Sequence, residues 1–299
     1  MPDRNRPLIG VLWMLATGLS FVAMTVFVKL VGTRLPAAEV GFLRYLLCLP
    51  LVVPALRGID WGQISRQSWT FLSWRGAAHS LAVVLWFYAI ARLPVAEVTA
   101  LNYLAPVYVT IGAALFLGET LALRRIAAVV VAVCGALVIL RPGFRTIDPA
   151  HLAILGGSVA LGVSYLLAKR LTRDVSPEIV IVMLSVMVSL ALFPVALWAG
   201  WVWPTWSEFW LLVLVAIFAT AGHYFMTLAF REAPVSVTQP VTFLQLLWSA
   251  LAGWIIFDEG LDIWVIAGGT VIVMAVSFIA WREHVLARQT TPPVEATKT

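Results

Sequence analysis

PVAEVTALNYLAPVYVTIGAALFLGE spans residues 94–119, and PVSVTQPVTFLQLLWSALAGWIIFDE spans residues 234–259. Each stretch opens with Pro-Val and closes with glutamate. The shift that carries position 94 onto position 234, which we call the repeat shift, also pairs Lys29 with Lys169. The chain has only 16 prolines and 15 acidic residues among 299. Agreement of such scarce residues in one register indicates an internal repeat without gaps.

The composition indicates a protein that is embedded in lipid. Hydrophobic residues make up 62% of the chain and charged residues 12%, whereas soluble domains have roughly 45–50% and about 25%. So few charges cannot cover the surface of a soluble domain, and we exclude that class. The net charge of +5 does not indicate nucleic-acid binding, because the basic residues lie between apolar runs, as in the loops of membrane proteins.

The apolar runs have the length that a membrane-spanning helix requires, about 20 residues. Turn and charge signals such as Arg141-Pro142-Gly143 separate them. The predicted fold class is therefore an all-α integral membrane protein with ten transmembrane helices. These helices are predicted over residues 7–31, 37–56, 70–91, 94–117, 122–140, 149–171, 177–199, 206–230, 234–256 and 261–281.

The repeat and the spans together predict an inverted architecture. Five spans fall in residues 1–141 and five in 148–282, and an odd number makes the second copy enter the membrane from the opposite side. Such inverted repeats surround a central cavity and support alternating access. Residues 283–299 are polar and are predicted to form a disordered cytoplasmic tail.

The basic residues predict the orientation in the membrane. Of the 20 lysines and arginines, 13 lie on the side of the two termini and 5 on the other, while Arg44 and Arg75 fall within spans. Because cytoplasmic loops carry the excess of positive charge, we expect both termini in the cytoplasm and the chain in the cell inner membrane.

The ends of the two quoted stretches resemble a known family. The first stretch resembles the EamA-type branch of the drug/metabolite transporter superfamily in Pro106 followed by Leu117-Gly118-Glu119. The second stretch has Phe257-Asp258-Glu259 at the matching positions, with aspartate in place of the glycine that is usual in this family. The resemblance covers about residues 8–281. It implies export of small metabolites, often amino acids or related compounds, through a central cavity between the halves.

Polar residues inside spans are costly, so each indicates a partner or a site. Four residues of the fourth span share one helical face through i, i+3, i+4, i+7 spacing, namely Thr99, Asn102, Tyr103 and Pro106. The repeat shift puts Gln239 and Thr242 on the matching face of the second half. Interhelical hydrogen bonding is the alternative explanation for these residues.

Histidines and deep aromatic residues extend the predicted site. His79 and Trp86 share a face of the third span, and His223 occupies a related face of the eighth. The alternative explanation is that these histidines only pack against neighbouring helices and bind no substrate. The full set of predicted substrate-binding residues is His79, Trp86, Thr99, Asn102, Tyr103, Tyr165, His223, Tyr224, Gln239, Thr242, Gln245 and Trp248.

This set combines aromatic walls with uncharged hydrogen-bonding groups. It favours a flat, partly apolar solute with polar ends, and we expect aromatic or neutral amino acids. Another small metabolite or drug is the alternative substrate. Arg44 has four possible roles, which are binding a substrate carboxylate, pairing with Glu39, extending to the interface, and hydrogen bonding to carbonyl groups. The predicted gating or structural residues are Pro94, Pro106, Glu119, Pro234, Pro240 and Glu259.

Other function classes lack their sequence signals. HExxH, CxxC, GxSxG and P-loop motifs do not occur, so we expect no enzyme, no metal and no cofactor, with an intramembrane transferase as the alternative of a different class. No acidic residue lies mid-span, which favours facilitated diffusion or exchange over proton coupling. Small residues at four-residue steps in the fifth and tenth spans, Ala127, Val131 and Gly135 with Ala267, Val271 and Ala275, predict close packing within a monomer or a homodimer.

Overall fold

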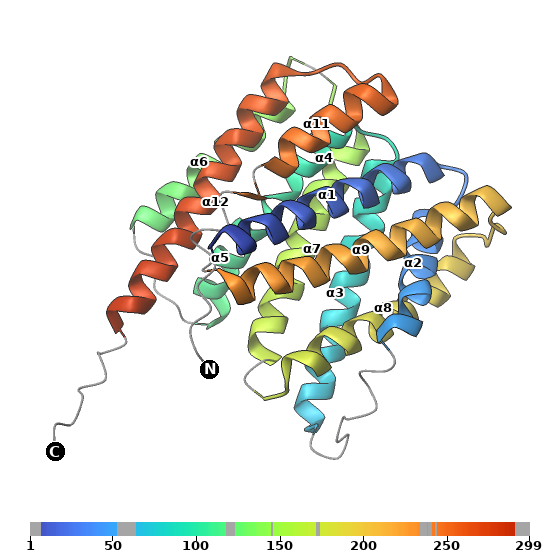
Figure 1. Cartoon of the computed structure of the whole chain (residues 1–299), viewed down its shortest axis with the longest axis horizontal. Helices are drawn as coiled ribbons and strands as arrows, with labels where there is room; N and C mark the ends of the chain where they lie inside the picture. Colours follow the sequence, from blue (N-terminus) through green and yellow to red (C-terminus); the bar gives the residue numbers. More distant parts are fainter. Residues whose placement is uncertain are drawn as a thin grey trace.

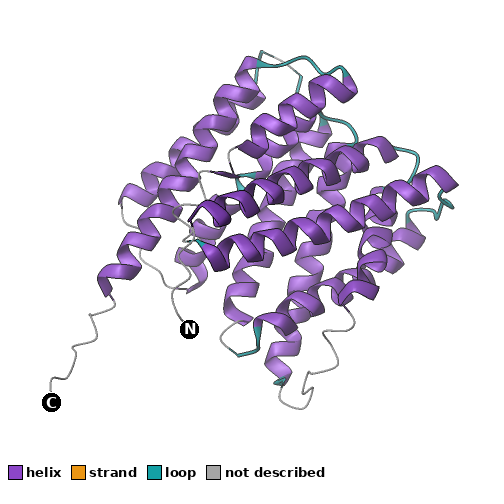
Figure 2. Cartoon of the chain, in the orientation of Figure 1, coloured by secondary structure: helices purple, strands orange, loops and turns teal. Residues whose placement is uncertain are grey.

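The computed structural model describes residues 7–52, 64–117, 123–144, 146–171, 174–233, 238, 241–242 and 244–290 (Figure 1). All the regular elements longer than one residue in these ranges are helices, joined by short loops (Figure 2). The helices are α1 (Pro7–Val31), α2 (Ala37–Val52), α3 (Arg66–Ile90), α4 (Val95–Asn102), α5 (Ala105–Leu117), α6 (Leu123–Leu140), α7 (Pro149–Leu171), α8 (Pro177–Trp198), α9 (Trp206–Glu232), α11 (Leu244–Phe257) and α12 (Ile263–Thr290).

Six stretches of the described residues, five of them single helices and one made of α4 and α5, are long and apolar enough to cross a membrane. They are Leu8–Val31, Val95–Leu115, Leu123–Leu140, Pro149–Leu171, Trp206–Glu232 and Ile263–Trp281, and each coincides closely with a predicted span. Two shorter apolar helices, Val182–Trp198 and Leu244–Phe257, accompany them. The all-α membrane fold is confirmed, and the number of ten spans stays a prediction.

The helices recur with the register of the sequence repeat. Under the repeat shift, the starts of α2, α3 and α6 coincide with the starts of α8, α9 and α12. The packing of the helices also repeats under this shift. Helix α1 packs against α9 (Figure 1), and α7 and α3, which are their counterparts in the other half, pack against each other. The two remaining large contacts, α2 with α8 and α6 with α12, join each helix to its own counterpart.

The predicted fourth span is not one continuous helix. Helix α4 ends at Asn102, the chain turns at residues 103–104, and α5 begins at Ala105. Pro106 explains the break, because its ring would clash with the carbonyl four residues earlier, whereas the first turn of a helix tolerates proline. The prediction that Pro106 shares one helical face with Thr99 is therefore wrong.

Pro94 lies before a helix and does not interrupt one. It has an extended backbone (φ −57°, ψ 142°) at the N-cap of α4, and its carbonyl accepts the N–H of Val98 at 3.1 Å. The matching residues of the second half, Pro234 and Pro240, lie outside the described residues. The described part of that half shows Thr238 as helical, a short 3₁₀ turn at 241–242 and then α11.

Asp258 forms the turn between α11 and α12 in a left-handed conformation, with φ of +53°. Aspartate tolerates this region better than most residues, although glycine adopts it most readily. The backbone at this position therefore explains why glycine is usual there, and why aspartate can replace it.

The contact between α6 and α12 depends on two glycines. A Cβ atom at Gly135 would lie 2.8 Å from the Gly268 carbonyl oxygen, and one at Gly268 would lie 2.5 Å from that of Gly135. Close packing of these helices is as predicted, but the predicted face is partly wrong. Ala127 and Val131 are exposed, whereas the buried stripe on α6 runs through Ala128, Ala132 and Gly135.

The last helix is longer than the predicted span. Helix α12 continues through Thr290, into the segment for which the sequence predicts a disordered tail. Residues 291–299 lie outside the described residues.

Candidate functional site

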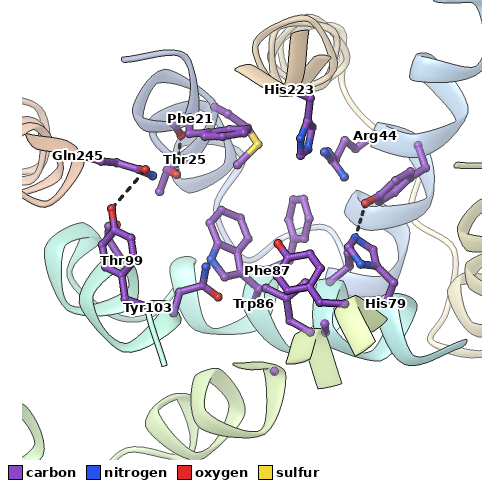
Figure 3. Close-up of a pocket in the computed structure, with 18 residues that line it drawn as sticks. Phe21, Thr25, Arg44, His79, Trp86, Phe87, Thr99, Tyr103, His223 and Gln245 are labelled. Atoms are coloured by element: carbon purple, nitrogen blue, oxygen red, sulfur yellow. Dashed lines mark hydrogen bonds between the residues drawn. The ribbon is translucent and has the colours of Figure 1, made fainter. Parts of the chain in front are cut away.

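A cavity of about 270 Å³ lies between α1, α2, α3, α4, α7, α9 and α11 (Figure 3). It draws on both halves of the chain. The lining residues are Phe21, Met24, Thr25, Arg44, Tyr45, His79, Ala82, Val83, Trp86, Phe87, Thr99, Asn102, Tyr103, Gly157, Leu161, Tyr165, His223 and Gln245. None of these described lining residues is acidic.

One end of the cavity is basic, and we define this basic end as Arg44, His79 and His223. Figure 3 shows these three side chains on one side of the cavity. The His79 ring is held from two sides, since Nε2 lies 2.8 Å from the Tyr45 hydroxyl and Nδ1 lies 3.2 Å from the Ser164 hydroxyl. These contacts fix the imidazole at the cavity wall.

The opposite end carries hydroxyl and amide groups, and we define this polar end as Thr99, Tyr103 and Gln245. In Figure 3 these residues lie across the cavity from the basic end. The Tyr103 hydroxyl donates to the Thr242 carbonyl at 2.8 Å and lies 3.4 Å from Oε1 of Gln245. The Thr99 hydroxyl donates to the Val95 carbonyl, one turn earlier, at 2.8 Å. The polar end therefore joins the first half to α11.

Aromatic rings separate the two ends. Trp86 and Phe87 lie between them in Figure 3, with ring centroids 5.3 Å apart and planes 81° apart. Phe21 packs edge-on against His223 with centroids 5.1 Å apart. An aromatic wall of this kind can stack on a flat ring, while the basic end and the polar end can bind groups at the edges of that ring.

Most residues of the predicted site line this cavity. They are His79, Trp86, Thr99, Asn102, Tyr103, Tyr165, His223 and Gln245. That they bind a substrate stays a prediction. Gln239 lies outside the described residues.

The other predicted site residues do not line the cavity. Tyr224 is 61% exposed and lies against Phe225. The Thr242 carbonyl accepts the hydrogen bond of the Tyr103 hydroxyl. Trp248 is half-buried, and its indole nitrogen has no hydrogen-bond partner among the described residues.

The sequence prediction missed several lining residues. Thr25 and Tyr45 are polar residues within predicted spans, so the cost of burying polar groups in a bilayer could have identified them. Phe21, Met24 and Phe87 had no such signal, because aromatic and apolar residues occur throughout the chain.

Ionic contacts gather where α1 ends and α4 begins. Glu259 accepts a hydrogen bond from Lys29 with one oxygen and the Val95 N–H, at 2.9 Å, with the other. Lys29 also donates to the Leu93 carbonyl. Glu259 thus ties the second half to two elements of the first, and we call this the Glu259 end of the molecule. Its counterpart Glu119 lies outside the described residues.

Further pairs reinforce the helix ends on the same side of the spans. Arg34, in the loop after α1, pairs with Glu208 in the first turn of α9, and this carboxylate raises the pKa of Arg34. Asp262, which precedes α12, pairs with Arg141, which follows α6. The described chain has no group of three or more histidine, cysteine, aspartate or glutamate side chains that could hold a metal ion.

Comparison with known proteins gives a family match over both halves. The model of the EamA-like transporter family matches residues 8–141 and again 148–281. A riboflavin transporter of Rhizobium johnstonii is 30% identical over 284 residues, covering 94% of each chain. A pseudopaline exporter of Pseudomonas aeruginosa is 31% identical over 269 residues, covering 89% of this chain and 94% of the relative.

More distant similarities are consistent with this match. An S-adenosylmethionine uptake transporter of Rickettsia felis is 26% identical, covering 92% of this chain and 94% of the relative. A crystal structure with 18% identity superposes with a TM-score of 0.57, covering 91% of this chain and 98% of the solved chain. At that identity, the superposition supports the fold alone.

Proposed function

Since this chain belongs to the EamA-like transporter family and is a multi-pass inner-membrane transporter of small molecules, not an enzyme, we propose that the cavity binds its solute. We further propose that this solute is a small, flat, partly apolar metabolite. The arrangement of the cavity carries the proposal, with a basic end, an aromatic wall and a polar end around one space.

The size of the cavity limits the solute. Its volume of about 270 Å³ lies just below the range of small-molecule sites, which is about 300–1,000 Å³. Aromatic amino acids satisfy this limit, and they carry polar groups that can bind at the basic end and at the polar end of the cavity. They are therefore the first substrates to test. Riboflavin is the second candidate, because its flat ring system suits the aromatic wall and a relative is named for it.

The relatives do not determine the direction of transport. One is named as an exporter and another as an uptake transporter. We propose that both termini lie in the cytoplasm, from the distribution of lysine and arginine along the chain. We propose export as the direction, by similarity to the relative that is named as an exporter.

Alternating access of two inverted repeats is the mechanism that we propose. The repeat shift between the helix starts and the exchange of packing partners support it, since they fit two similar halves that move as units. In this conformation Glu259 joins the halves at its own end of the molecule. Loss of that contact would accompany opening at this end.

A flux assay in proteoliposomes tests the proposed function. Purified protein is reconstituted, loaded with unlabelled tryptophan, phenylalanine, leucine or riboflavin, and supplied with the labelled compound outside. We expect saturable counterflow for at least one of the aromatic compounds. Saturable counterflow of leucine without that of any aromatic compound is not expected. Uptake no faster than in protein-free liposomes for every aromatic compound would refute the proposed substrate class.

A matched variant connects the flux to the cavity. Trp86→Ala removes the ring between the two polar ends, whereas Trp74→Ala removes an exposed ring of the same helix that does not line the cavity. The first should reduce flux and the second should not. Equal flux in both variants would separate transport from this cavity.

A further inference from the structure

We propose that Arg44 forms an anion subsite in the cavity, which binds the carboxylate or a similar acidic group of the transported solute. The inference rests on the proposed function, because it assigns the charge of the same solute. Arg44 lies within α2, lines the cavity and is only 8% exposed. Figure 3 shows its guanidinium directed toward the cavity beside His223.

The structure removes two of the other roles considered for Arg44. Glu39 does not pair with it, because Oε2 of Glu39 accepts the Val202 N–H at 3.0 Å and no ion pair joins the two residues. Extension to the interface is also excluded, since Arg44 is only 8% exposed and lines the cavity between the helices.

Among the described residues, no carboxylate contacts Arg44. Its guanidinium packs over the Tyr45 ring, with Cζ 4.2 Å from the ring centroid, and its Nε is buried without a hydrogen-bond partner in the described part of the chain. A buried charge without a counter-charge is strongly unfavourable, which indicates that it is kept for a ligand.

Other basic residues of the chain have protein partners. Lys29 pairs with Glu259, Arg141 pairs with Asp262, and Arg75 donates to the Val180 carbonyl. Each of these side chains therefore has at least one partner within the protein, although Nε of Arg75 and of Arg141 is buried without a hydrogen-bond partner in the described part of the chain, as Nε of Arg44 is. Arg44 differs because it faces the space that the solute would occupy.

The surroundings of Arg44 fit a carboxylate. A guanidinium presents parallel N–H donors that match the two oxygens of a carboxylate. The described lining residues include no acidic side chain that would repel an anion, and the His223 imidazole lies at the same end. A solute with an acidic group at one edge of an aromatic ring would place that group on Arg44 and stack the ring near Trp86.

Binding of a matched acid and amide tests the subsite. Indole-3-acetate and indole-3-acetamide differ only in the acidic group, and their binding is measured by calorimetry on the purified full chain. The wild-type protein should bind the acid more tightly. Arg44→Gln should weaken binding of the acid by roughly 10- to 100-fold, the loss of one charged hydrogen-bonded contact, and should change binding of the amide by less than about twofold.

Control variants separate binding from folding. Arg44→Lys should give an intermediate loss, because an ammonium cannot form the paired contact. Arg92→Gln removes an exposed charge that packs on Tyr88 outside the cavity, and it should bind both compounds as the wild type does. Without ligand, Arg44→Gln should unfold at the same or a higher temperature than the wild type, since an unpaired buried charge is removed.

The outcomes distinguish the subsite from the proposed function. Equal binding of acid and amide by the wild type, or equal losses for both in Arg44→Gln, would overturn the anion subsite. Saturable counterflow of riboflavin, together with equal binding of indole-3-acetate and indole-3-acetamide, would overturn the subsite and leave the proposed transport of flat metabolites intact. Failure of both indole compounds to bind, together with no flux of any aromatic compound, would overturn both.

Discussion

Replacing Glu259 with glutamine should open the molecule at the Glu259 end. The carboxylate accepts the Val95 N–H at 2.9 Å and an ionic hydrogen bond from Lys29. A glutamine side chain has the same length and can still accept the Val95 N–H through its oxygen. The substitution therefore removes mainly the ionic contact that joins the two halves.

The magnitude follows from the environment of this pair. Both side chains are 15% exposed, so solvent screens the contact only in part. Exposed ion pairs contribute about 0.2–1 kcal/mol and hydrogen bonds to charged groups about 1.5–3 kcal/mol, so we expect a loss of about 1–2 kcal/mol. The ratio of the conformer open at this end to the closed one should rise by a factor of about 5–30.

Cysteine labelling measures this ratio. The two native cysteines, Cys48 and Cys134, are first replaced, and a cysteine is introduced at Thr25, which lines the cavity. A membrane-impermeant maleimide is then applied from the Glu259 side. Glu259→Gln should increase the rate of labelling by the same factor of about 5–30. A cysteine at Ser158, which is fully buried, should stay unlabelled and so report that the fold is intact.

Two results would refute this reasoning. The first is an unchanged labelling rate at position 25 in Glu259→Gln. The second concerns Lys29→Met, which removes the same contact from the other partner. If the effects of the two substitutions simply add in the double variant, the two residues are not energetically coupled, and their contact does not hold this end closed.

Other substitutions test the packing and the cavity. Gly268→Leu should lower the free energy of unfolding by about 1–3 kcal/mol through overpacking against α6, whereas Gly260→Ala, whose Cβ would meet no atom within 4 Å, should leave thermal unfolding in detergent unchanged. His79→Ala should reduce transport roughly tenfold by removing the fixed imidazole, whereas Tyr224→Ala should change it by less than about twofold, as initial flux rates would show. Tyr103→Phe should lose about 1 kcal/mol of stability with its hydrogen bond, measured by thermal unfolding, and an unchanged melting temperature would count against that bond.

Sequence reasoning identified those parts of the fold that depend on scarce residues. Prolines and glutamates in one register revealed the repeat shift, and the structure repeats its helices under that same shift. Apolar length located the spans, because lipid imposes one length on every crossing helix. The face of α6 could not be located in the same way. That helix is apolar all around, so Ala127 and Ala128 look equivalent until α12 packs against one of them.

The cavity was predictable where polar residues occur within apolar spans. His79, Thr99 and Gln245 stand out for this reason, and all three line the cavity. Arg44 stood out as well, but its role depended on whether Glu39 lies within reach, which is a question of three-dimensional contacts. Phe21 has no sequence signal, because only the packing of α1 against α9 brings its ring to His223.

The position of the cavity follows from the helix break at Tyr103. Inside a membrane, non-helical backbone is tolerated only where protein or a solvated cavity satisfies its polar groups. The repeat shift carries the break between α4 and α5 at residues 103–104 to residues 243–244, directly after the 3₁₀ turn at 241–242. The Tyr103 hydroxyl donates to the Thr242 carbonyl at 2.8 Å, so a side chain at one break satisfies the backbone at the other. This contact connects the two halves at the polar end of the cavity, which Tyr103 lines. A movement of the halves that separated Tyr103 from Thr242 would therefore change the groups that a solute meets there.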